Sequence, residues 1–433
     1  MNGNGSKVYA VDDDSVAATD GGNSKKYTSE NENLLPGREF LTRTHSALYY
    51  MPVYKEKVET TYMRLFHKFI NQSCKLRRIL SSIWLQNYYT PTADFLPHLK
   101  GKFVLLTGGT EGIGFEIALG LVLRGAYVMI TSSKTKRAAL AVDAITALCK
   151  LKPQKIDFII SHIGSEGPAG ILSAIKHLED TDLYHSSHKD CPYGEIHSLF
   201  MDITDIKSIE DAIEALGIHL PKTNFSHVIL CASVFPAENL KSIYGHEMTF
   251  TGNVLANFII IQLMIRNHMV KFESQILFLG CEDYFYSTNC VGEVLHADRD
   301  FNDTLRHNIY NESKLGLFWL AFEIQKRYEF LNVCVVHPGY VDTERGRDHM
   351  YHHIGNFNLM FFISARSASQ TVIICAQYSK LLPKGAYYHN TLGFVTLDPR
   401  ETAMDELKAT SQWDYLQQVF DRYYNASHPG RES

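Results

Sequence analysis

The sequence predicts an α/β fold in which a doubly wound parallel sheet is covered by helices on both faces, with an N-terminal helical arm ahead of it. From Lys102 onward, short β-branched runs alternate with helical stretches, which is the βαβ pattern of a parallel sheet. The expected strands are nearly continuous apolar runs, as strands buried on both faces require. The glycine-rich segment VLLTGGTEGIG, Val104–Gly114, joins the first expected strand to the first expected helix. Together these features predict a Rossmann-type domain over residues 99–400.

The expected strands follow one another along this domain. The first strand is expected at Phe103–Thr107, and the helix after it at Gly112–Arg124. The apolar run Phe258–Ile265 is too short to cross a membrane and is predicted to be a core helix. Further strands are expected at Tyr127–Thr131, Ser198–Met201, His227–Leu230, Gln275–Leu279, Val333–Val336 and Gly393–Val395.

The stretch 150–196 is longer than a βαβ crossover needs and is predicted to be a surface insertion. It contains a strand-like run, Ile156–Ile160, and a polar patch with His185 and His188. Neighbouring histidines suggest a metal site, but no acidic or cysteine partner completes a ligand spacing. A solvated surface patch is therefore the favoured interpretation.

The composition is ordinary for a globular protein with a buried core. Of the 433 residues, 45% are hydrophobic and 21% are charged, and the net charge of -5 gives no sign of a nucleic-acid partner. The eight cysteines form no CxxC pair and no Cys/His cluster with zinc spacing, so neither a disulfide framework nor a metal site is predicted. The first residues are polar, and no apolar run reaches the ~18 to 20 residues of a membrane span. We expect an intracellular protein, cytoplasmic or peripherally membrane-associated.

The two ends of the chain are predicted to lie outside the main domain. Residues 1–45 are rich in small polar residues and are expected to form a disordered tail, and residues 401–433 a C-terminal helical extension. Residues 46–98 are expected to form a helical arm, in which 54–85 combines apolar with basic side chains, Arg78 among them. Two interpretations stay open: a basic amphipathic helix on an anionic membrane surface, or an arm packed on the main domain with a solvated basic face. The loose periodicity of the apolar residues favours packing.

The glycine-rich segment has the spacing of a nucleotide-binding loop. Gly108 can permit the tight turn after the strand, Gly112 the close approach of a pyrophosphate, and Gly114 the close packing of helix on strand. A phosphate bound there would lie at the positive end of the helix dipole. Because the motif follows an expected strand and opens an expected helix, it predicts a dinucleotide site.

The spacing TGxxxGxG resembles the cofactor motif of short-chain dehydrogenase/reductases more closely than the GxGxxG motif of other Rossmann dehydrogenases. The resemblance extends from about Lys102 to Leu397. The helix YNESKLGLFWLAFEIQKR, the segment HPGYV and the long loop between Cys281 and Tyr310 resemble the branch of the retinol dehydrogenases and the WW-domain-containing oxidoreductase. The paired tryptophans of a WW domain are absent before the glycine motif. The resemblance implies an NAD(P)-dependent oxidoreductase.

The resemblance implies a catalytic pair, Tyr310 and Lys314, in the sequence YNESK. The tyrosine exchanges a proton with the substrate oxygen. The lysine, one helical turn later on the same face, lowers the pKa of the tyrosine and holds the nicotinamide ribose. In the segment FTGNVLANFIIIQL, Asn253 takes the place of the family's asparagine, which continues the proton relay through a water. The alternative for Asn253 is a helix asparagine hydrogen-bonded within the core.

The resemblance also implies a set of cofactor-binding residues. The second strand ends in Thr-Ser-Ser-Lys, without the carboxylate that pairs with the ribose of NAD, and Lys134 with the serines can hold a 2′-phosphate. NADP(H) is therefore favoured, and NAD(H) stays open. Asp202 resembles the aspartate that contacts the adenine, or alternatively caps the helix that begins near Thr204. The full set comprises Thr107, Gly108, Thr110, Glu111, Gly112, Ile113, Gly114, Ser132, Ser133, Lys134, Asp202, Ile203, Cys231, Ala232, Ser233, Tyr310, Lys314, Pro338, Gly339, Val341 and Thr343, the last four around the nicotinamide.

Two positions depart from the family pattern. The usual Asn-Ala-Gly after the fourth strand is replaced by Cys231-Ala232-Ser233, and the serine that holds the substrate oxygen is replaced by Cys281. A thiol is a weaker donor than a hydroxyl, and losing one oxyanion donor costs ~10² to 10³ in rate, although Ser287 in the same loop could replace it. Glu282 and Asp283 would oppose the low thiol pKa that a nucleophilic or redox role needs. These departures leave open a nucleotide-binding pseudoenzyme or scaffold with weak or no turnover.

The stretch after Thr343 is rich in apolar and aromatic side chains and is predicted to form a substrate lid. Such a lid fits a lipophilic alcohol or carbonyl of the retinoid, steroid or fatty aldehyde type, although packing against the core or a membrane explains the same residues. Family members often dimerise through the helices around Asn253 and Tyr310, so a homodimer stays open, as does peripheral membrane contact through residues 54–85. The expected lid residues are Met350, Tyr351, Phe357, Leu359, Met360, Phe361 and Phe362.

Overall fold

The computed structural model describes residues 78–86, 90, 92–93, 99–163, 167–177, 192–220, 222–236, 238, 240–289, 303–343 and 362–427. The predicted tail 1–45 and the arm up to residue 77 lie outside these residues. The same holds for the patch around His185 and His188 and for the predicted lid as far as Phe361.

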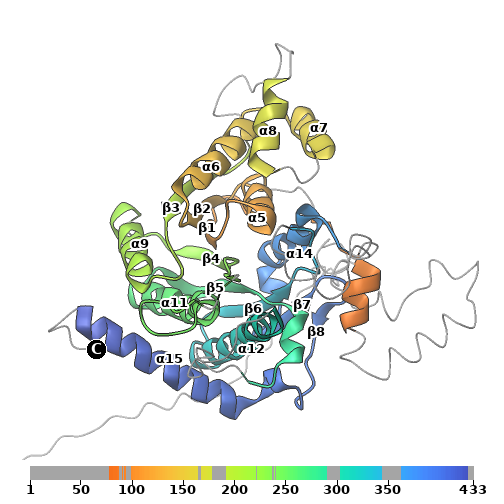
Figure 1. The fold of residues 1–433 in the computed structure, drawn as a ribbon. Helices are drawn as coiled ribbons and strands as arrows, with labels where there is room; N and C mark the ends of the chain where they lie inside the picture. The colour runs from red at the N-terminus through yellow and green to blue at the C-terminus, as the bar shows by residue number, and fades with distance from the viewer. Residues whose placement is uncertain are drawn as a thin grey trace, which may run out of the picture.

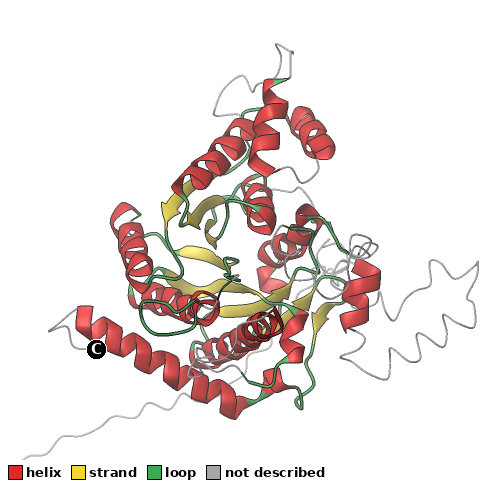
Figure 2. Ribbon diagram, viewed as in Figure 1, coloured by secondary structure: helices red, strands yellow, loops and turns green. Residues whose placement is uncertain are grey.

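An eight-stranded sheet forms the centre of the described fold, in the order β3-β2-β1-β4-β5-β6-β7-β8 (Figure 1, Figure 2). Strands β1 to β7 pair in parallel, which confirms the predicted doubly wound architecture, whereas β8 pairs antiparallel with β7. The chain order reverses between β1 and β4, and doubly wound sheets bind ligands in the crevice beyond the strand ends at such a point. The strands are β1 (Phe103–Thr107), β2 (Tyr127–Ser132), β3 (Glu195–Phe200), β4 (Phe225–Leu230), β5 (Val270–Leu279), β6 (Asn332–His337), β7 (Ala386–His389) and β8 (Gly393–Val395).

Three strands differ clearly from the prediction. Strand β3 begins at Glu195 rather than at Ser198, β5 begins at Val270 rather than at Gln275, and β7 is absent from the predicted set. The four residues of β7, AYYH, are too few to reveal a strand period. The connection from β7 to β8, Asn390 to Leu392, is too short for a crossover, so β8 returns as an antiparallel edge strand.

Side chains alternate along the strands between two hydrophobic cores, one on each face of the sheet. In β1, Leu105 belongs to one core and Leu106 to the other, and in β6 the same holds for Val335 and Val336. This alternation is the period of two that a strand imposes on its side chains. The first core includes α9 (Ile206–His219), α11 (Ala256–Arg266) and α12 (Asp303–Arg327), and the second includes α5 (Gly112–Val122), α6 (Thr135–Cys149) and α14 (Ala365–Gln377).

The strand expected at Ile156–Ile160 is wrong, because these residues lie within helix α7 (Pro153–Ile163). Ile156 and Ile159 are buried, whereas Phe158 is half exposed, which is helical rather than alternating burial. Helix α7 packs on α8 (Gly167–Lys176), and α8 packs on α6, so the insertion stands out at the top of Figure 1.

One continuous helical stretch in the described residues is long and apolar enough to cross a membrane. It runs from Met248 to Arg266 through α10 (Met248–Phe250), η4 (Thr251–Leu255) and α11. Its most apolar window is 89% buried inside the protein, so it forms a core helix, as predicted for Phe258–Ile265.

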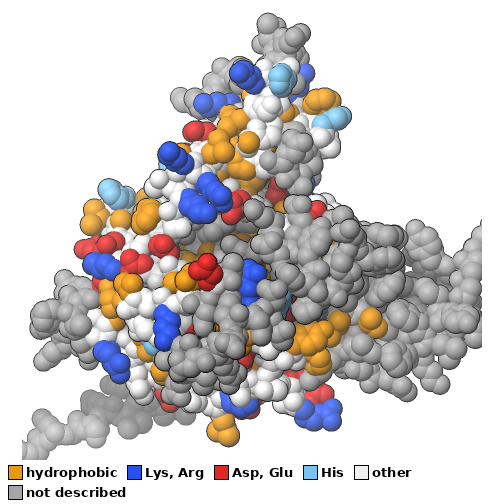
Figure 3. Space-filling view, viewed as in Figure 1, with side chains coloured by type: hydrophobic (Ala, Val, Ile, Leu, Met, Phe, Trp, Pro, Cys, Tyr) orange, Lys and Arg blue, Asp and Glu red, His pale blue; other side chains and the backbone are white. Residues whose placement is uncertain are grey.

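The visible surface mixes charges of both signs. Figure 3 shows Lys and Arg side chains interspersed with Asp and Glu, and on this face they form no extended patch of one sign. Large apolar side chains are exposed at separate places, such as Phe200, Ile243 and Leu407, and single exposed apolar residues are normal for a folded protein.

The C-terminal helix α15 (Glu406–Ser427) packs against α11 and α12. The ring of Trp413 meets the ring of Phe258 edge to face, with 5.0 Å between centroids, and the Arg327 guanidinium lies 4.6 Å above the Trp413 ring. Helix α15 therefore covers part of α11 and α12. These helices belong to the region around Asn253 and Tyr310 through which family members often dimerise.

Replacing Trp413 by alanine should lower the free energy of unfolding by about 3 to 5 kcal/mol, because it removes a buried aromatic side chain from this contact. Urea denaturation of the full chain measures the change. Leu407→Ala is the matched control, since Leu407 lies on the same helix but is 85% exposed, and its effect should stay within about 0.5 kcal/mol. Equal losses in the two variants would contradict the docking of α15.

Candidate active site

The glycine-rich loop between β1 and α5 is built for close backbone approach. Gly108 and Gly112 have φ values of +74° and +54°, a region that favours glycine. A Cβ on Gly108 would lie 2.9 Å from the Cα of Ala232, and one on Gly114 would overlap the carbonyl oxygen of Gly108. Side chains at these positions would push the loop away from the end of β4 and from the first turn of α5.

Thr107 joins the ends of β1 and β4. Its Oγ1 accepts the N–H groups of Cys231 and Ala232, both at 3.0 Å. These contacts place Cys231-Ala232-Ser233 beside the glycine-rich loop at the point where the strand order reverses. The departure from Asn-Ala-Gly thus leaves the backbone connection between the two strands in place.

The loop residues fit the pyrophosphate of a dinucleotide. Helix α5 begins directly after the loop, and its N-cap residue, Glu111, makes no side-chain capping bond. The positive end of the helix dipole therefore points into the loop, where it favours an anion. A Cβ on Gly112 would lie 3.4 Å from the Cγ2 of Thr343, so Thr343 lies against the loop, as expected for a residue of the cofactor site.

Basic side chains follow β2 beside this loop. The Oγ of Ser132 accepts the N–H of Lys134 at 3.0 Å, and the intervening Ser133 is exposed. On the first turn of α6, the Arg137 guanidinium forms an ion pair with the carboxylate of Glu111. The sequence places Glu111 among the cofactor residues but does not predict this pair.

Asp202 shapes the turn after β3. Its Oδ1 accepts the N–H and the hydroxyl of Thr204 at 2.9 and 2.7 Å, with the half-buried Ile203 between them. The N-cap of α9 is Asp205, whose carboxylate accepts the N–H of Lys207 at 3.0 Å. The alternative that Asp202 caps this helix is therefore wrong: Asp205 is the cap, and Asp202 stabilises the turn before it.

Tyr310 and Lys314 lie one turn apart on α12. The Nζ of Lys314 is 5.3 Å from the centroid of the Tyr310 ring and donates to the carbonyl oxygen of Leu279 at 3.1 Å. Lys314 is buried and Tyr310 half-buried. The ring of Phe235 packs edge-on against that of Tyr310, with 5.2 Å between centroids. The pair therefore lies between the end of β5 and the loop after β4.

Asn253 lies on the π-helical turn η4 and holds the loop after β4 against α12. Its Oδ1 accepts the N–H of Val234 at 2.7 Å, and its Nδ2 donates to the carbonyl oxygen of Val234 at 3.1 Å and to the Oγ of Ser313 at 3.0 Å. Its own carbonyl oxygen accepts the side chain of Asn257 at 2.8 Å. These contacts agree with the alternative of an asparagine hydrogen-bonded within the core, and π-helical turns are frequent at functional sites.

Cys281 caps the short helix η5 (Glu282–Tyr286) and bonds to a carboxylate within it. The thiol donates to the Oδ2 of Asp283 at 3.0 Å, and the Tyr340 hydroxyl donates to the Oδ1 at 2.9 Å. Burial, and next the Asp283 carboxylate, raise the pKa of the Cys281 thiol well above its usual value, while the charge of Lys314 opposes this. The thiol is therefore protonated at neutral pH, and Asp283 and Tyr340 join the site although the sequence did not single them out as functional.

The turn at Pro338–Gly339 is enclosed by two segments that the predicted site lacked. Gly339 has a φ of +101°, and a Cβ there would lie 2.6 Å from both the Oε1 of Gln86 and the Nδ2 of Asn390. Val341 then forms a bridge with Ile363. Glycine at position 339 thus lets the arm and the end of β7 close around this turn.

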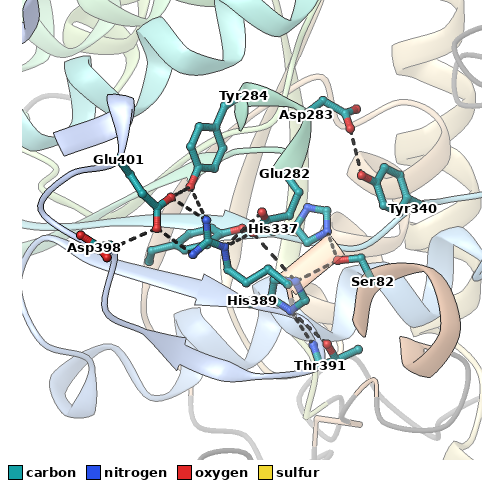
Figure 4. A network of polar contacts seen from close by, with 12 residues as sticks. Ser82, Glu282, Asp283, Tyr284, His337, Tyr340, His389, Thr391, Asp398 and Glu401 are labelled. Atoms are coloured by element: carbon teal, nitrogen blue, oxygen red, sulfur yellow. Dashed lines mark hydrogen bonds and ion pairs between the residues drawn. The ribbon is translucent and has the colours of Figure 1, made fainter. Parts of the chain in front are cut away.

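The described part of the arm, residues 78–86, lies beside this turn and includes the π-helix η2 (Ser81–Leu85). Arg78 is 1% exposed. The expectation that its side chain, as part of the basic face, is solvated or faces a membrane is therefore wrong. Its guanidinium pairs with Glu282 at 3.1 Å and Glu401 at 2.6 Å. Figure 4 shows these two carboxylates in one buried polar network.

Replacing Asp283 by asparagine should lower the pKa of the Cys281 thiol, because it removes the carboxylate that raises it. Alkylation of Cys281 at about pH 9, followed by mass spectrometry, should therefore be faster than in the wild type. Asp211→Asn, at an exposed position on α9, should leave the rate unchanged. A rate in Asp283→Asn equal to or below that of the wild type would refute this assignment.

Comparison with known proteins agrees with this geometry. Retinol dehydrogenase 14 of Mus musculus is 26% identical over 324 residues, which cover 73% of this chain and 85% of that protein. The WW domain-containing oxidoreductase of Gallus gallus is 22% identical over 335 residues, covering 74% of this chain and 68% of that protein. The crystal structure of an uncharacterised protein from Mycobacterium paratuberculosis has the same fold, with a TM-score of 0.52 and 17% identity over 76% of this chain and 97% of its own.

No protein-family model matches the chain. The relatives nevertheless extend over almost three quarters of it, and they carry the names of the two groups that its motifs resemble. The chain is therefore similar, over almost three quarters of its length, to retinol dehydrogenases and WW domain-containing oxidoreductases, and it shares its fold with a solved structure.

Proposed function

We propose that the protein is an NADP(H)-dependent oxidoreductase that interconverts a lipophilic alcohol and its carbonyl by hydride transfer. The proposal rests chiefly on the buried Nζ of Lys314, 5.3 Å from the centroid of the Tyr310 ring and near the carboxyl ends of the strands, where the glycine-rich loop also lies. A phenol that exchanges protons needs its anionic form stabilised, and a buried cation does this.

Each residue of the pair has a defined part in the reaction. When bound, the nicotinamide supplies a hydride to the carbonyl carbon during reduction and takes it back during oxidation. Tyr310 donates its phenolic proton to the carbonyl oxygen in the first direction and accepts it in the second. Lys314 stabilises the phenolate that remains. Asn253 holds the loop after β4 against α12, and its part in a proton relay stays a prediction.

A lipophilic substrate is supported by the apolar surroundings of the site and by the relatives. Val341, Ile363 and Ala365 form a small buried apolar cluster that Ile113 of the glycine-rich loop joins. The name of one relative refers to retinol, a lipophilic alcohol. The apolar side chains of this cluster favour an apolar ligand. Recognition of the ligand's oxygen is then left to a few polar groups.

Preference for NADP(H) is supported by the charges that follow β2. Lys134 and Arg137 lie beside the glycine-rich loop, and the strand ends without a carboxylate. An arginine can hold a phosphate by a charge-assisted, bidentate pair. Glu111, which pairs with Arg137, competes with a phosphate for that guanidinium.

A cofactor-binding protein with little or no turnover is the second candidate, and one observation favours it. The Cys281 thiol already donates to Asp283, so the group in place of the family's serine has its proton engaged elsewhere. Against this candidate, Tyr310 and Lys314 are both retained and lie together. A chain freed from catalysis would not need to keep both.

Turnover of a lipophilic aldehyde separates the two candidates. With NADPH and retinaldehyde as the probe, Tyr310→Phe should lower the rate at least ~10²-fold, because the proton donor is lost. Cys281→Ser should raise it, because a hydroxyl is the better donor. All three proteins should bind NADPH alike. Wild-type protein that binds NADPH but reduces no lipophilic carbonyl would instead support the second candidate.

Cofactor choice depends on the charges at the end of β2. Arg137→Gln should weaken NADPH binding about tenfold and leave NADH binding unchanged, because only NADPH carries the 2′-phosphate. Glu111→Gln should strengthen NADPH binding, because it frees the guanidinium of Arg137. Titration of each variant with both cofactors measures these changes. Parallel losses for NADH and NADPH in Arg137→Gln would contradict the assignment.

A further inference from the structure

The arm segment 78–86 docks on the sheet through a buried polar face. Arg78, Ser82 and Gln86 follow one another at four-residue intervals, and all three are buried. A helix that only covers a core buries an apolar stripe. Buried polar groups must instead meet specific partners, so they define one position for the helix.

Arg78 connects the arm to the residue after Cys281. Its Nε donates to both oxygens of Glu282, at 3.1 and 3.2 Å, and Glu282 is the next residue after Cys281. Its Nη1 and Nη2 donate to the two oxygens of Glu401, at 3.0 and 2.6 Å. Without the guanidinium, two buried carboxylates would lie close together with no cation between them, which is strongly unfavourable.

Gln86 connects the arm to Cys281 along a second path. Its Oε1 accepts the N–H of Tyr340 at 2.9 Å, and its Nε2 donates to the carbonyl oxygen of Tyr340 at 3.1 Å. The amide thus bonds both backbone groups of one residue, as a neighbouring strand would. The hydroxyl of the same Tyr340 donates to Asp283, which accepts the Cys281 thiol on its other oxygen. Hydrogen bonds on both the backbone and the side chain of Tyr340 therefore connect Gln86 to Cys281.

Ser82 lies between two histidines at the ends of β6 and β7, as Figure 4 shows. The N–H of Thr391 donates to the Nδ1 of His389 at 3.2 Å, so the Nε2 of His389 carries the proton and donates to the Ser82 hydroxyl at 2.8 Å. Ser82 then donates to the Nε2 of His337 at 3.1 Å. Burial lowers the pKa of His337 to about 4, so it is neutral and able to accept. His337 directly precedes the turn at Pro338–Gly339.

We propose that segment 78–86 is a positioning element of the catalytic site, in which Arg78 and Gln86 hold Cys281 and the turn at Gly339 and Tyr340 in place. Their partners lie in the loops after β5 and β6 and in the segment before α15, whereas β2 and the glycine-rich loop belong to the other half of the strand order. The segment should therefore govern the geometry of Cys281 and of this turn, while the glycine-rich loop keeps its arrangement. The role in catalysis rests on the proposed function, whereas the role in holding Cys281 does not.

The reactivity of Cys281 tests the inference without requiring turnover. Gln86→Leu removes both bonds to Tyr340 with little change in size, so Cys281 should be alkylated at least about tenfold faster, as mass spectrometry of the full chain would show. Arg78→Met should act in the same direction, and Arg78→Lys, which keeps the charge, should restore part of the protection.

The matched control is Arg124→Met. Arg124 is also 1% exposed, but its guanidinium donates to the backbone carbonyls of Gly120 in α5 and of Ala93, which lies outside segment 78–86. This variant should leave the alkylation of Cys281 at the wild-type rate. Wild-type alkylation in Gln86→Leu and Arg78→Met, or equal acceleration in Arg124→Met, would overturn the inference.

Turnover gives the second measurement. If retinaldehyde is reduced, Gln86→Leu should lower kcat by ~10 to 10²-fold, because small displacements of reacting groups are costly. An unchanged kcat would refute the catalytic part of the inference. Absence of turnover in the wild type would refute the proposed function instead, and the alkylation rates would still decide whether the arm holds Cys281.

Discussion

A guanidinium between two buried carboxylates joins three parts of the chain that are far apart in sequence. Arg78, Glu282 and Glu401 come from the arm, the loop after β5 and the segment before α15. Moving each ion out of water costs several kcal/mol, and only good geometry with further hydrogen bonds offsets this. The hydroxyls of Tyr284 and Tyr387 supply those bonds, one to each carboxylate. The cluster therefore contributes less to net stability than to a single, defined arrangement of the three segments.

This arrangement bears directly on the exchange of serine for Cys281. A sulfur atom is larger than oxygen and a weaker donor, so it must be placed by its surroundings rather than by its own strong bonds. Asp283 accepts a hydrogen bond from the thiol and another from the Tyr340 hydroxyl. Gln86 in turn accepts a hydrogen bond from the backbone N–H of Tyr340. The cysteine is thus part of a coordinated set of polar contacts that reaches the N-terminal arm.

The parts of the fold that were predictable from sequence are those decided by local patterns. Strand β1 and the glycine-rich loop follow from a short apolar run and from backbone conformations that favour glycine. The strand expected at Ile156–Ile160 is wrong because five apolar-rich residues fit a strand or one face of a helix equally well. Pro153, at the first position of the helix, is the local signal that favours a helix. The burial of Arg78 was not predictable, since its partner Glu282 lies 204 residues away.

The site likewise contains features set by local sequence motifs and features set by contacts between distant segments. Cofactor-side features, such as Thr107 joined to the residues after β4, arise from short motifs at the ends of adjacent strands, and the family resemblance captures them. The surroundings of Cys281 are instead stabilised by contacts between segments far apart in sequence, such as that of Arg78 in the arm with Glu401. Function on a common fold resides in groups added around it. Because the end segments hold Cys281 and the turn at Gly339 without being part of the nucleotide loop, changes in those segments can alter how a substrate is held while the nucleotide loop stays the same.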